Sequence, residues 1–135
     1  MAYSITTQGQ AITFVDALRA CIQNVAGTPA SQVGAVQTFF ARVRGSASPA
    51  VTSTQAATVI AILRDASFGN SDIPAAQIAD ANTIGSYLLN TTVHSTVLQA
   101  QAVLNAVWVA YQSIADAPAA QVEAVNNLIT ALQAL

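Results

Sequence analysis

Lysine is absent from this chain of 135 residues, and charged residues of all kinds make up only 7% of it. Soluble domains usually carry about 25% charged residues. Four arginines and six acidic residues give a net charge of −2, while hydrophobic residues reach 53%. The chain is therefore able to bury a core but has few charges for its remaining surface. Because net charge keeps protein molecules apart, we expect a surface that is mostly covered by copies of the same chain.

Cysteine and histidine each occur once, which excludes two classes of site. A single cysteine, Cys21, cannot form an internal disulfide. One histidine, His94, and one distant cysteine cannot supply the ligands of a zinc site, so we expect no metal. The sequence also has no apolar run of about 18 residues and no basic, apolar leader at its start. We therefore expect no membrane partner and an intracellular location.

Reactive side chains do not converge in the sequence. It contains no phosphate-binding glycine loop, no GxSxG motif and no HExxH motif. Its carboxylates are isolated except near arginines, as with Asp16 and Arg19, and such pairs are typical of a solvated surface. We therefore expect no catalytic residue, no cofactor and no enzyme activity.

The sequence contains a five-residue pattern typical of a helix start, and this pattern occurs three times. PASQV at 29–33 returns as PAAQI at 74–78 and PAAQV at 118–122, with offsets of 45 (74 − 29) and 44 (118 − 74) residues. Proline suits the first turn of a helix, where its missing N–H is no loss. Apolar residues recur at helical spacing with the same offsets. After the prolines they are Val33, Val36, Phe40 and Val43, then Ile78, Ala81, Gly85 and Leu88, then Val122, Val125, Ile129 and Leu132; before them they are Ala11, Phe14, Val15 and Leu18, then Ala56, Val59, Ile60 and Leu63, then Ala100, Val103, Leu104 and Val107.

Two amphipathic helices in each repeat predict an all-α fold. We expect a single self-assembling domain over 1–135, an antiparallel helical bundle of three αα-hairpin repeats of about 44 residues. Asp72 and Asp116 stand two residues before their prolines and are the expected helix caps. The alternative is that Ala- and Gln-rich helices resemble one another without repetition, and the all-α prediction holds either way. The expected helices span 8–26, 31–44, 54–66, 74–89, 95–114 and 119–134.

Arg42 and Arg44, within ARVRGS, form the one basic cluster of the sequence. Both lie at a predicted helix C-terminus, where a cation interacts favourably with the helix dipole, and one interpretation is that they serve only this structural role. Alternatively, two arginines beside a Gly-Ser loop bind a phosphate. Arg64 adjoins Asp65 but points in another direction on its helix, so it stays available, whereas Arg19 has an acidic residue one turn earlier. The candidate nucleic-acid-binding residues are therefore Arg42, Arg44 and Arg64.

Four stretches together resemble the coat proteins of rod-shaped plant viruses of the tobamovirus type. They are AYSITT at 2–7, LRACIQNVAG at 18–27, VQTFFARV at 36–43 with SASP after it, and DAPAAQVEAVNNLITAL at 116–132. They follow the family's order. The resemblance implies long antiparallel helices that stack laterally into a helical tube around single-stranded RNA, with few arginines per subunit. It also implies a location in the virion and the host cytoplasm.

Two features depart from this family's pattern. Residues 65–135 contain no arginine where the family has several, and the family's Phe-Pro motif is missing. The alternative is a silk-type helical assembly domain, as in spider silk proteins, which would be extracellular and shares the Ala, Ser, Gln and Val content with little charge. In both interpretations the main partner is a second copy of the chain. We expect Asp65, Asp72, Asp80 and Asp116 at the contacts between copies.

Overall fold

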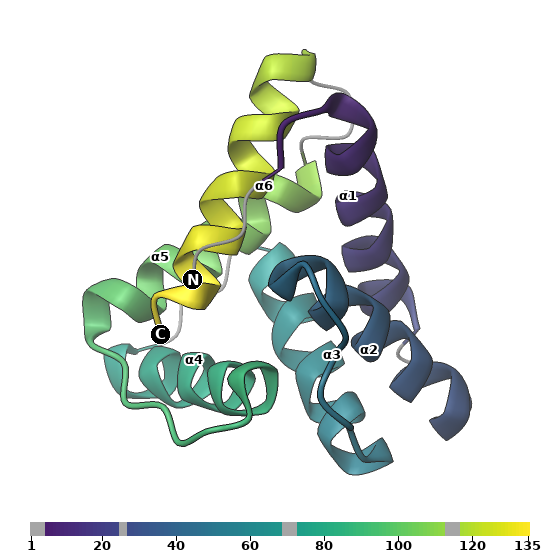
Figure 1. The fold of residues 1–135 in the computed structure, drawn as a ribbon. Coiled ribbons are helices and arrows are strands. Elements are labelled where there is room, and N and C mark those ends of the chain that lie inside the picture. The colour runs from purple at the N-terminus through teal and green to yellow at the C-terminus, as the bar shows by residue number, and fades with distance from the viewer. Residues whose placement is uncertain (1–4, 25–26, 69–72, 113–116) are drawn as a thin grey trace.

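A computed structural model of the chain describes residues 5–24, 27–68, 73–112 and 117–135. These residues form six α-helices and no strand, so the predicted all-α bundle is confirmed (Figure 1). The helices are α1 (Gln8–Gln23), α2 (Pro29–Arg44), α3 (Ser53–Ser67), α4 (Pro74–Leu89), α5 (Val97–Gln112) and α6 (Pro118–Gln133).

The starts of the helices repeat with the spacing of the prolines. Helices α2, α4 and α6 begin at Pro29, Pro74 and Pro118, and each proline occupies the first turn. Helices α1, α3 and α5 begin 21 residues before these prolines, at Gln8, Ser53 and Val97. Both sets of helices therefore follow the offsets of 45 and 44 residues, and the structure has three equivalent helix pairs.

A threonine and a glutamine cap the first helix of every pair. Thr7 and Gln10, at the start of α1, form a capping box, in which each side chain accepts a hydrogen bond from the other residue's backbone N–H. The same box recurs as Thr52 with Gln55 and as Thr96 with Gln99. Since Thr96 caps α5, that helix begins at Val97 and not at 95 as predicted, and His94 lies before it.

Several other helix ends differ from the prediction by one to three residues; α2, for example, begins at Pro29 and not at 31. Helix α1 ends at Gln23, where the backbone N–H of Asn24 donates to the carbonyl of Cys21, and not at 26. The N-cap positions of α4 and α6 are Ile73 and Ala117, whose side chains make no capping hydrogen bond. The expected caps Asp72 and Asp116 lie outside the described residues.

The apolar positions that repeat in the sequence form the core. All twelve residues of the stripe before the prolines are buried, in α1, α3 and α5 alike. In the stripe after the prolines, the last three positions of each repeat are buried. The first position is half-buried in all three repeats, at Val33, Ile78 and Val122. Equivalent positions therefore have equivalent environments, which supports a true repeat.

The three helix pairs adjoin one another in a closed arrangement. Helix α2 packs on α3, α4 packs on α5, and α6 returns to pack on α1, beside it at the top of Figure 1. Within the pairs, α1 packs on α2 and α5 on α6, as expected for αα-hairpins. The middle pair differs, because α3 and α4 share only a small contact and α3 packs chiefly on α1, α2 and α5.

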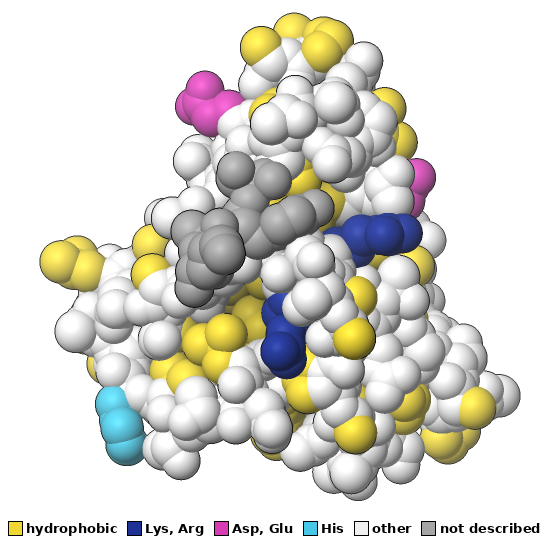
Figure 2. Space-filling view, in the orientation of Figure 1, with side chains coloured by type: hydrophobic (Ala, Val, Ile, Leu, Met, Phe, Trp, Pro, Cys, Tyr) yellow, Lys and Arg dark blue, Asp and Glu magenta, His cyan; other side chains and the backbone are white. Residues whose placement is uncertain are grey.

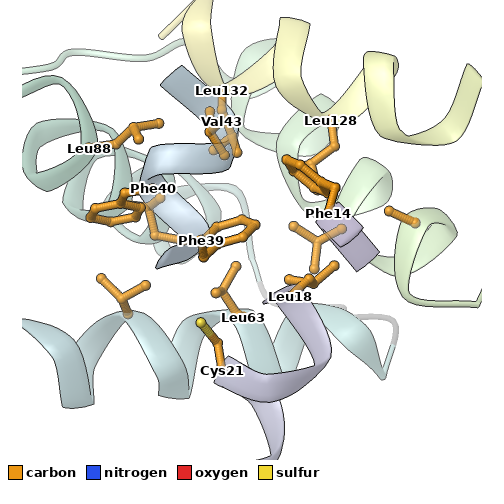
Figure 3. Close-up of a cluster of buried hydrophobic side chains, with 14 of the residues drawn as sticks. Phe14, Leu18, Cys21, Phe39, Phe40, Val43, Leu63, Leu88, Leu128 and Leu132 are labelled. Atoms are coloured by element: carbon orange, nitrogen blue, oxygen red, sulfur yellow. The ribbon is translucent and has the colours of Figure 1, made fainter. Parts of the chain in front are cut away.

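Aromatic side chains fill one side of the core. Phe14 and Phe39 meet edge to face with ring centroids 5.5 Å apart, and Phe40 adjoins Phe39 at 6.1 Å (Figure 3). Gly85 stands at the position equivalent to Phe40. A Cβ atom there would lie 2.8 Å from Cδ1 of Leu135. The last residue of the chain thus occupies the space that a side chain fills in the other repeats.

Two equivalent asparagines connect the second repeat to the third and the third repeat to the first. Asn82 on α4 accepts hydrogen bonds from the N–H and hydroxyl of Ser95, at 2.6 and 2.7 Å, just before α5. Asn126 on α6 accepts from the N–H of Ile5 at 2.8 Å and donates to its carbonyl at 3.0 Å, just before α1. The link that joins neighbouring repeats therefore also joins the last repeat to the first.

The Asn126 link predicts a specific loss of stability. Asn126→Ala should lower the free energy of unfolding by about 1–3 kcal/mol, because it removes two hydrogen bonds and leaves the polar backbone of Ile5 unpaired. Thr130→Ala, one turn later on the exposed side of α6, is the control and should change little. Urea denaturation followed by circular dichroism measures both. Equal losses of unfolding free energy in the two variants would contradict a stabilising role for the Asn126 hydrogen bonds.

Candidate functional site

The arginines predicted to bind nucleic acid lie at two helix ends. Arg42 and Arg44 are in the last turn of α2, which stops at Gly45 in the left-handed conformation with φ 68°. Residues two apart on a helix do not face each other. The two side chains accordingly enter different surroundings and form no joint site. Arg64, in the last turn of α3, is exposed.

Arg44 connects two helices. Its Nη1 donates to the carbonyl oxygen of Leu88 at 3.3 Å, and the residue is half-buried. Leu88 belongs to the last turn of α4, whose carbonyls have no partner within the helix. A cation there also interacts favourably with the helix dipole. Arg44 therefore has the structural role that its position at a helix end predicts. It stabilises the C-terminal end of α4 as well as that of its own helix, α2.

Arg42 faces the start of α1. It is exposed and lines a groove of about 390 Å³ whose other walls come from α1 and the segment before it. The N-terminus of a helix carries a partial positive charge, which adds to the charge of the guanidinium. Together, the Arg42 guanidinium and the start of α1 give this groove the polarity to receive an anion. Its other lining residues are Ile5, Thr7, Gly9, Gln10, Thr13 and Phe14.

Arg19 is bound within the fold, but by a different partner from the one expected. Its Nη1 donates to the carbonyl of Tyr111 at 3.2 Å, and its guanidinium lies 4.7 Å from the centre of the Tyr111 ring. Tyr111 is in the last turn of α5, so Arg19 caps this helix as Arg44 caps α4. The sequence instead suggested Asp16, which is exposed. Figure 2 shows how little charge of either sign remains on the face it displays.

The second and third helix pairs carry equivalent grooves on their outer faces. The groove of α3 and α4 has a volume of about 510 Å³, and Asp65 and Asp80 both line it. The groove of α5 and α6 has a volume of about 260 Å³, and the equivalent positions are Val109 and Ala124. Its lining includes no charged residue: Ala102, Asn105, Ala106, Val109, Ala124, Asn127 and Ala131. Of the four carboxylates expected at subunit contacts, Asp72 and Asp116 lie outside the described residues.

Large apolar side chains are exposed on several parts of the chain, including Ile12 on α1, which is 39% exposed. Phe68 and Ile73, at the junction of α3 and α4, are each 70% exposed. On α5, Leu98 is 78% exposed and Val109 is 45% exposed. The predictions from the sequence concerned charged and reactive groups and did not include these residues. The available signal was Phe68 and Ile73 on either side of the polar stretch 69–72.

Reactive groups remain dispersed among the described residues. His94 is exposed. No group of three or more His, Cys, Asp or Glu side chains in the described ranges could hold a metal ion. None of the described helices is both long and apolar enough to cross a membrane.

No protein-family model, curated protein or solved structure matches this chain, so its function has to be argued from its own surface.

The arginine geometry predicts unequal effects of two neighbouring substitutions. Arg44→Ala should lower the free energy of unfolding by about 1 kcal/mol, because a carbonyl of α4 loses its hydrogen bond and a cation. Arg42→Ala, at an exposed site, should stay within about 0.5 kcal/mol of the parent protein. Urea denaturation at matched oligomeric state measures the difference. A larger effect for Arg42 would overturn this assignment.

Cys21 gives a prediction about reactivity and pH. Burial raises the pKa of its thiol from 9.0 to about 12, and its Sγ lies 3.2 Å from the carbonyl of Ala35. The native protein should therefore react with thiol reagents at pH 8 far more slowly than the urea-unfolded chain. Because the folded pKa is the higher one, stability should be complete below pH 9 and fall as the pH rises toward 12, by up to about 1.4 kcal/mol per unit. Cys21→Ala should lack this component of the pH dependence, and fast labelling of the native protein would contradict burial.

Proposed function

We propose that this chain is a structural protein that assembles with copies of itself into a rod or filament, as a viral coat protein does. The observation that carries the proposal is the exposure of large apolar side chains, above all Phe68, Ile73 and Leu98, on a surface with few charges. Exposed apolar surface marks sites of association. Because these residues lie on different parts of the chain, one copy can contact more than one neighbour, which an extended polymer requires.

We further propose that the polymer holds single-stranded nucleic acid, with Arg42 and Arg64 as the contacts to phosphate. Both residues are exposed, whereas Arg19 and Arg44 donate to helix carbonyls. Arg42 has the additional support of the positive end of α1, beside which it lies. Each neutralised phosphate adds separately to the affinity. Two arginines per copy would be weak in a monomer but effective when a filament repeats them along one strand.

The decisive experiment examines purified particles by electron microscopy and by the ratio of absorbance at 260 and 280 nm. We expect rods of constant diameter that contain nucleic acid. Arg42→Gln with Arg64→Gln should still assemble but carry much less nucleic acid. The salt dependence, log K against log salt, should become shallower by about 0.7 for each arginine removed. The control Arg42→Lys with Arg64→Lys keeps both charges and should keep most of the load.

The outcomes of this experiment separate the two structural functions. Parent filaments without nucleic acid would refute the coat function and favour the silk-type assembly domain, which needs no polyanion. A full load in the double Gln variant would show that Arg42 and Arg64 are not the contacts. A parent protein that stays monomeric at high concentration would refute both functions, because each depends on self-association.

A further inference from the structure

Three junctions hold the helix pairs in their closed arrangement, and two of them contain a covalent loop. Residues 45–52 join the first pair, α1 and α2, to the second pair, α3 and α4. Residues 90–96 join the second pair to the third, α5 and α6. The third pair meets the first without a loop, chiefly where α6 packs on α1, and we call this packing the closing contact. Because no loop ties its two sides together directly, a second copy of the chain can supply either side.

Side-chain hydrogen bonds tie the first pair to the third pair more than to the second. Between the described residues of the first and second pairs there is one, from Arg44 to the carbonyl of Leu88 at 3.3 Å. Across the closing contact, Asn126 bonds to Ile5 at 2.8 and 3.0 Å, Gln8 to Gln121 at 3.1 Å, Arg19 to Tyr111 at 3.2 Å and Gln133 to Val43 at 2.7 Å. Hydrogen bonds depend on direction as well as distance, so the first pair fits the third pair in one orientation.

Residues 45–52 lack the anchor that holds the loop of residues 90–96. In the latter loop, Ser95 donates two hydrogen bonds to Asn82 of α4. Gln37 of α2 stands at the position equivalent to Asn82, and its side chain makes no hydrogen bond to residues 45–52, all of which the structure describes. The hydrogen bonds of residues 45–52 reach no further than four residues along the chain, and Val51 is the one buried residue among them. Little therefore fixes this loop against the helices, as a hinge requires.

The first pair is held together by its own contacts. Phe14 of α1 meets Phe39 of α2 edge to face (Figure 3). At the other end of the pair, the side chain of Asn24 donates to the hydroxyl of Ser31 at 2.9 Å. The first pair can therefore move about residues 45–52 as one unit and keep its internal packing.

We propose that the first helix pair of one copy takes, in a second copy, the place that it fills in its own chain, with residues 45–52 as the hinge. The closing contact is then made between two molecules, with the same hydrogen bonds and the same buried side chains. A copy that contributes its first pair to one neighbour and receives a first pair from another extends a filament in one direction. This exchange rests on the self-assembly part of the proposed function and does not involve nucleic acid.

The exchange costs little free energy, because it remakes the contacts that it breaks. The main difference between the closed and exchanged forms is the conformation of the hinge. A net charge of −2 gives only weak repulsion between copies that approach each other. Because the exchanged form joins molecules, its share should rise with protein concentration.

Cross-linking between two variants traps the exchange, in protein that also carries Cys21→Ala. One variant has Gln8→Cys and the other has Gln121→Cys, which replace two side chains that meet across the closing contact. The variants are unfolded together in urea, refolded, allowed to assemble and treated with a short bis-maleimide. Exchange should give a covalent dimer of one copy of each variant on a denaturing gel. Gln121 is only 4% exposed, so a copy that adheres to the outside does not bring its residue 8 there.

Gln23→Cys in place of Gln8→Cys is the matched control. Gln23 is exposed at the opposite end of α1, about 22 Å from Gln8 at 1.5 Å per residue. It should give little covalent dimer with the Gln121→Cys variant. If the Gln8→Cys mixture assembles and gives no more covalent dimer than this control, the exchange is wrong.

Locking the closing contact within one copy should block assembly. A chain that carries Gln8→Cys, Gln121→Cys and Cys21→Ala is cross-linked at low concentration with a bis-maleimide that contains a cleavable disulfide. Sedimentation should find the locked copies monomeric at a concentration at which the unmodified chain polymerises, because they cannot release their first pair. Reduction of the reagent should restore polymerisation. Locked copies that polymerise like the unmodified chain would overturn the exchange.

The results distinguish the exchange from the proposed function. If the parent protein polymerises without cross-links between copies, the exchange is wrong and self-assembly stands. If copies exchange but electron microscopy shows dimers only, the exchange stands and the filament is wrong. If exchanged copies form filaments that hold no nucleic acid, the exchange stands and the coat function is wrong.

Discussion

The packing of α6 on α1 is the contact on which the rest of this structure depends. A pair of amphipathic helices cannot bury its apolar face alone, and in an open repeat protein the outermost units need polar caps. Here the third pair covers the first, so that the stripes of Leu18, Leu63 and Leu132 meet in one core. The Asn126 link to Ile5 adds a polar connection at this junction. Closure lets a chain with few charges place its apolar residues inside without separate caps.

Closure also determines how the few cations are used. In α4 and α5 the last turn has no basic residue of its own. Arg44 and Arg19 reach across from α2 and α1 to these turns and donate to their carbonyls. Two of the four arginines therefore donate to the end of a helix other than their own. Arg42 and Arg64 lie in the last turns of their own helices and are exposed, so they are the two cations that an external anion can reach.

Local sequence patterns predicted the fold well, because the determinants of a helix lie within a few residues. The prolines identified the starts of α4 and α6 to within one residue, and the stripes identified the core. The Thr-x-x-Gln boxes were equally visible in the sequence, and attention to them would have placed the start of α5 at Val97. Packing between helices was less accessible. No local signal indicates that α3 contacts α5 more than α4.

The arrangement of the arginines was likewise predictable where it depends on neighbouring residues and not where it depends on distant ones. The divergence of Arg42 and Arg44 follows from their spacing of two residues on a helix. The partner of Arg44 is 44 residues away, and only the closed arrangement of the pairs brings Leu88 to it. The offsets of the repeat already show that Phe68 corresponds to Gln23 and Val109 to Asp65. The exposure of Phe68 and the place of Val109 in the α5/α6 groove depend on how the helices pack, which local sequence does not indicate.

The three repeats agree in the core and differ on the outside. The α3/α4 groove has two carboxylates, Asp65 and Asp80, whereas the described lining of the α5/α6 groove has none. Core positions are constrained because each repeat packs against the others, and surface positions are not constrained in this way. Each helix pair therefore presents a chemically distinct outer surface, although all three share one pattern of buried residues.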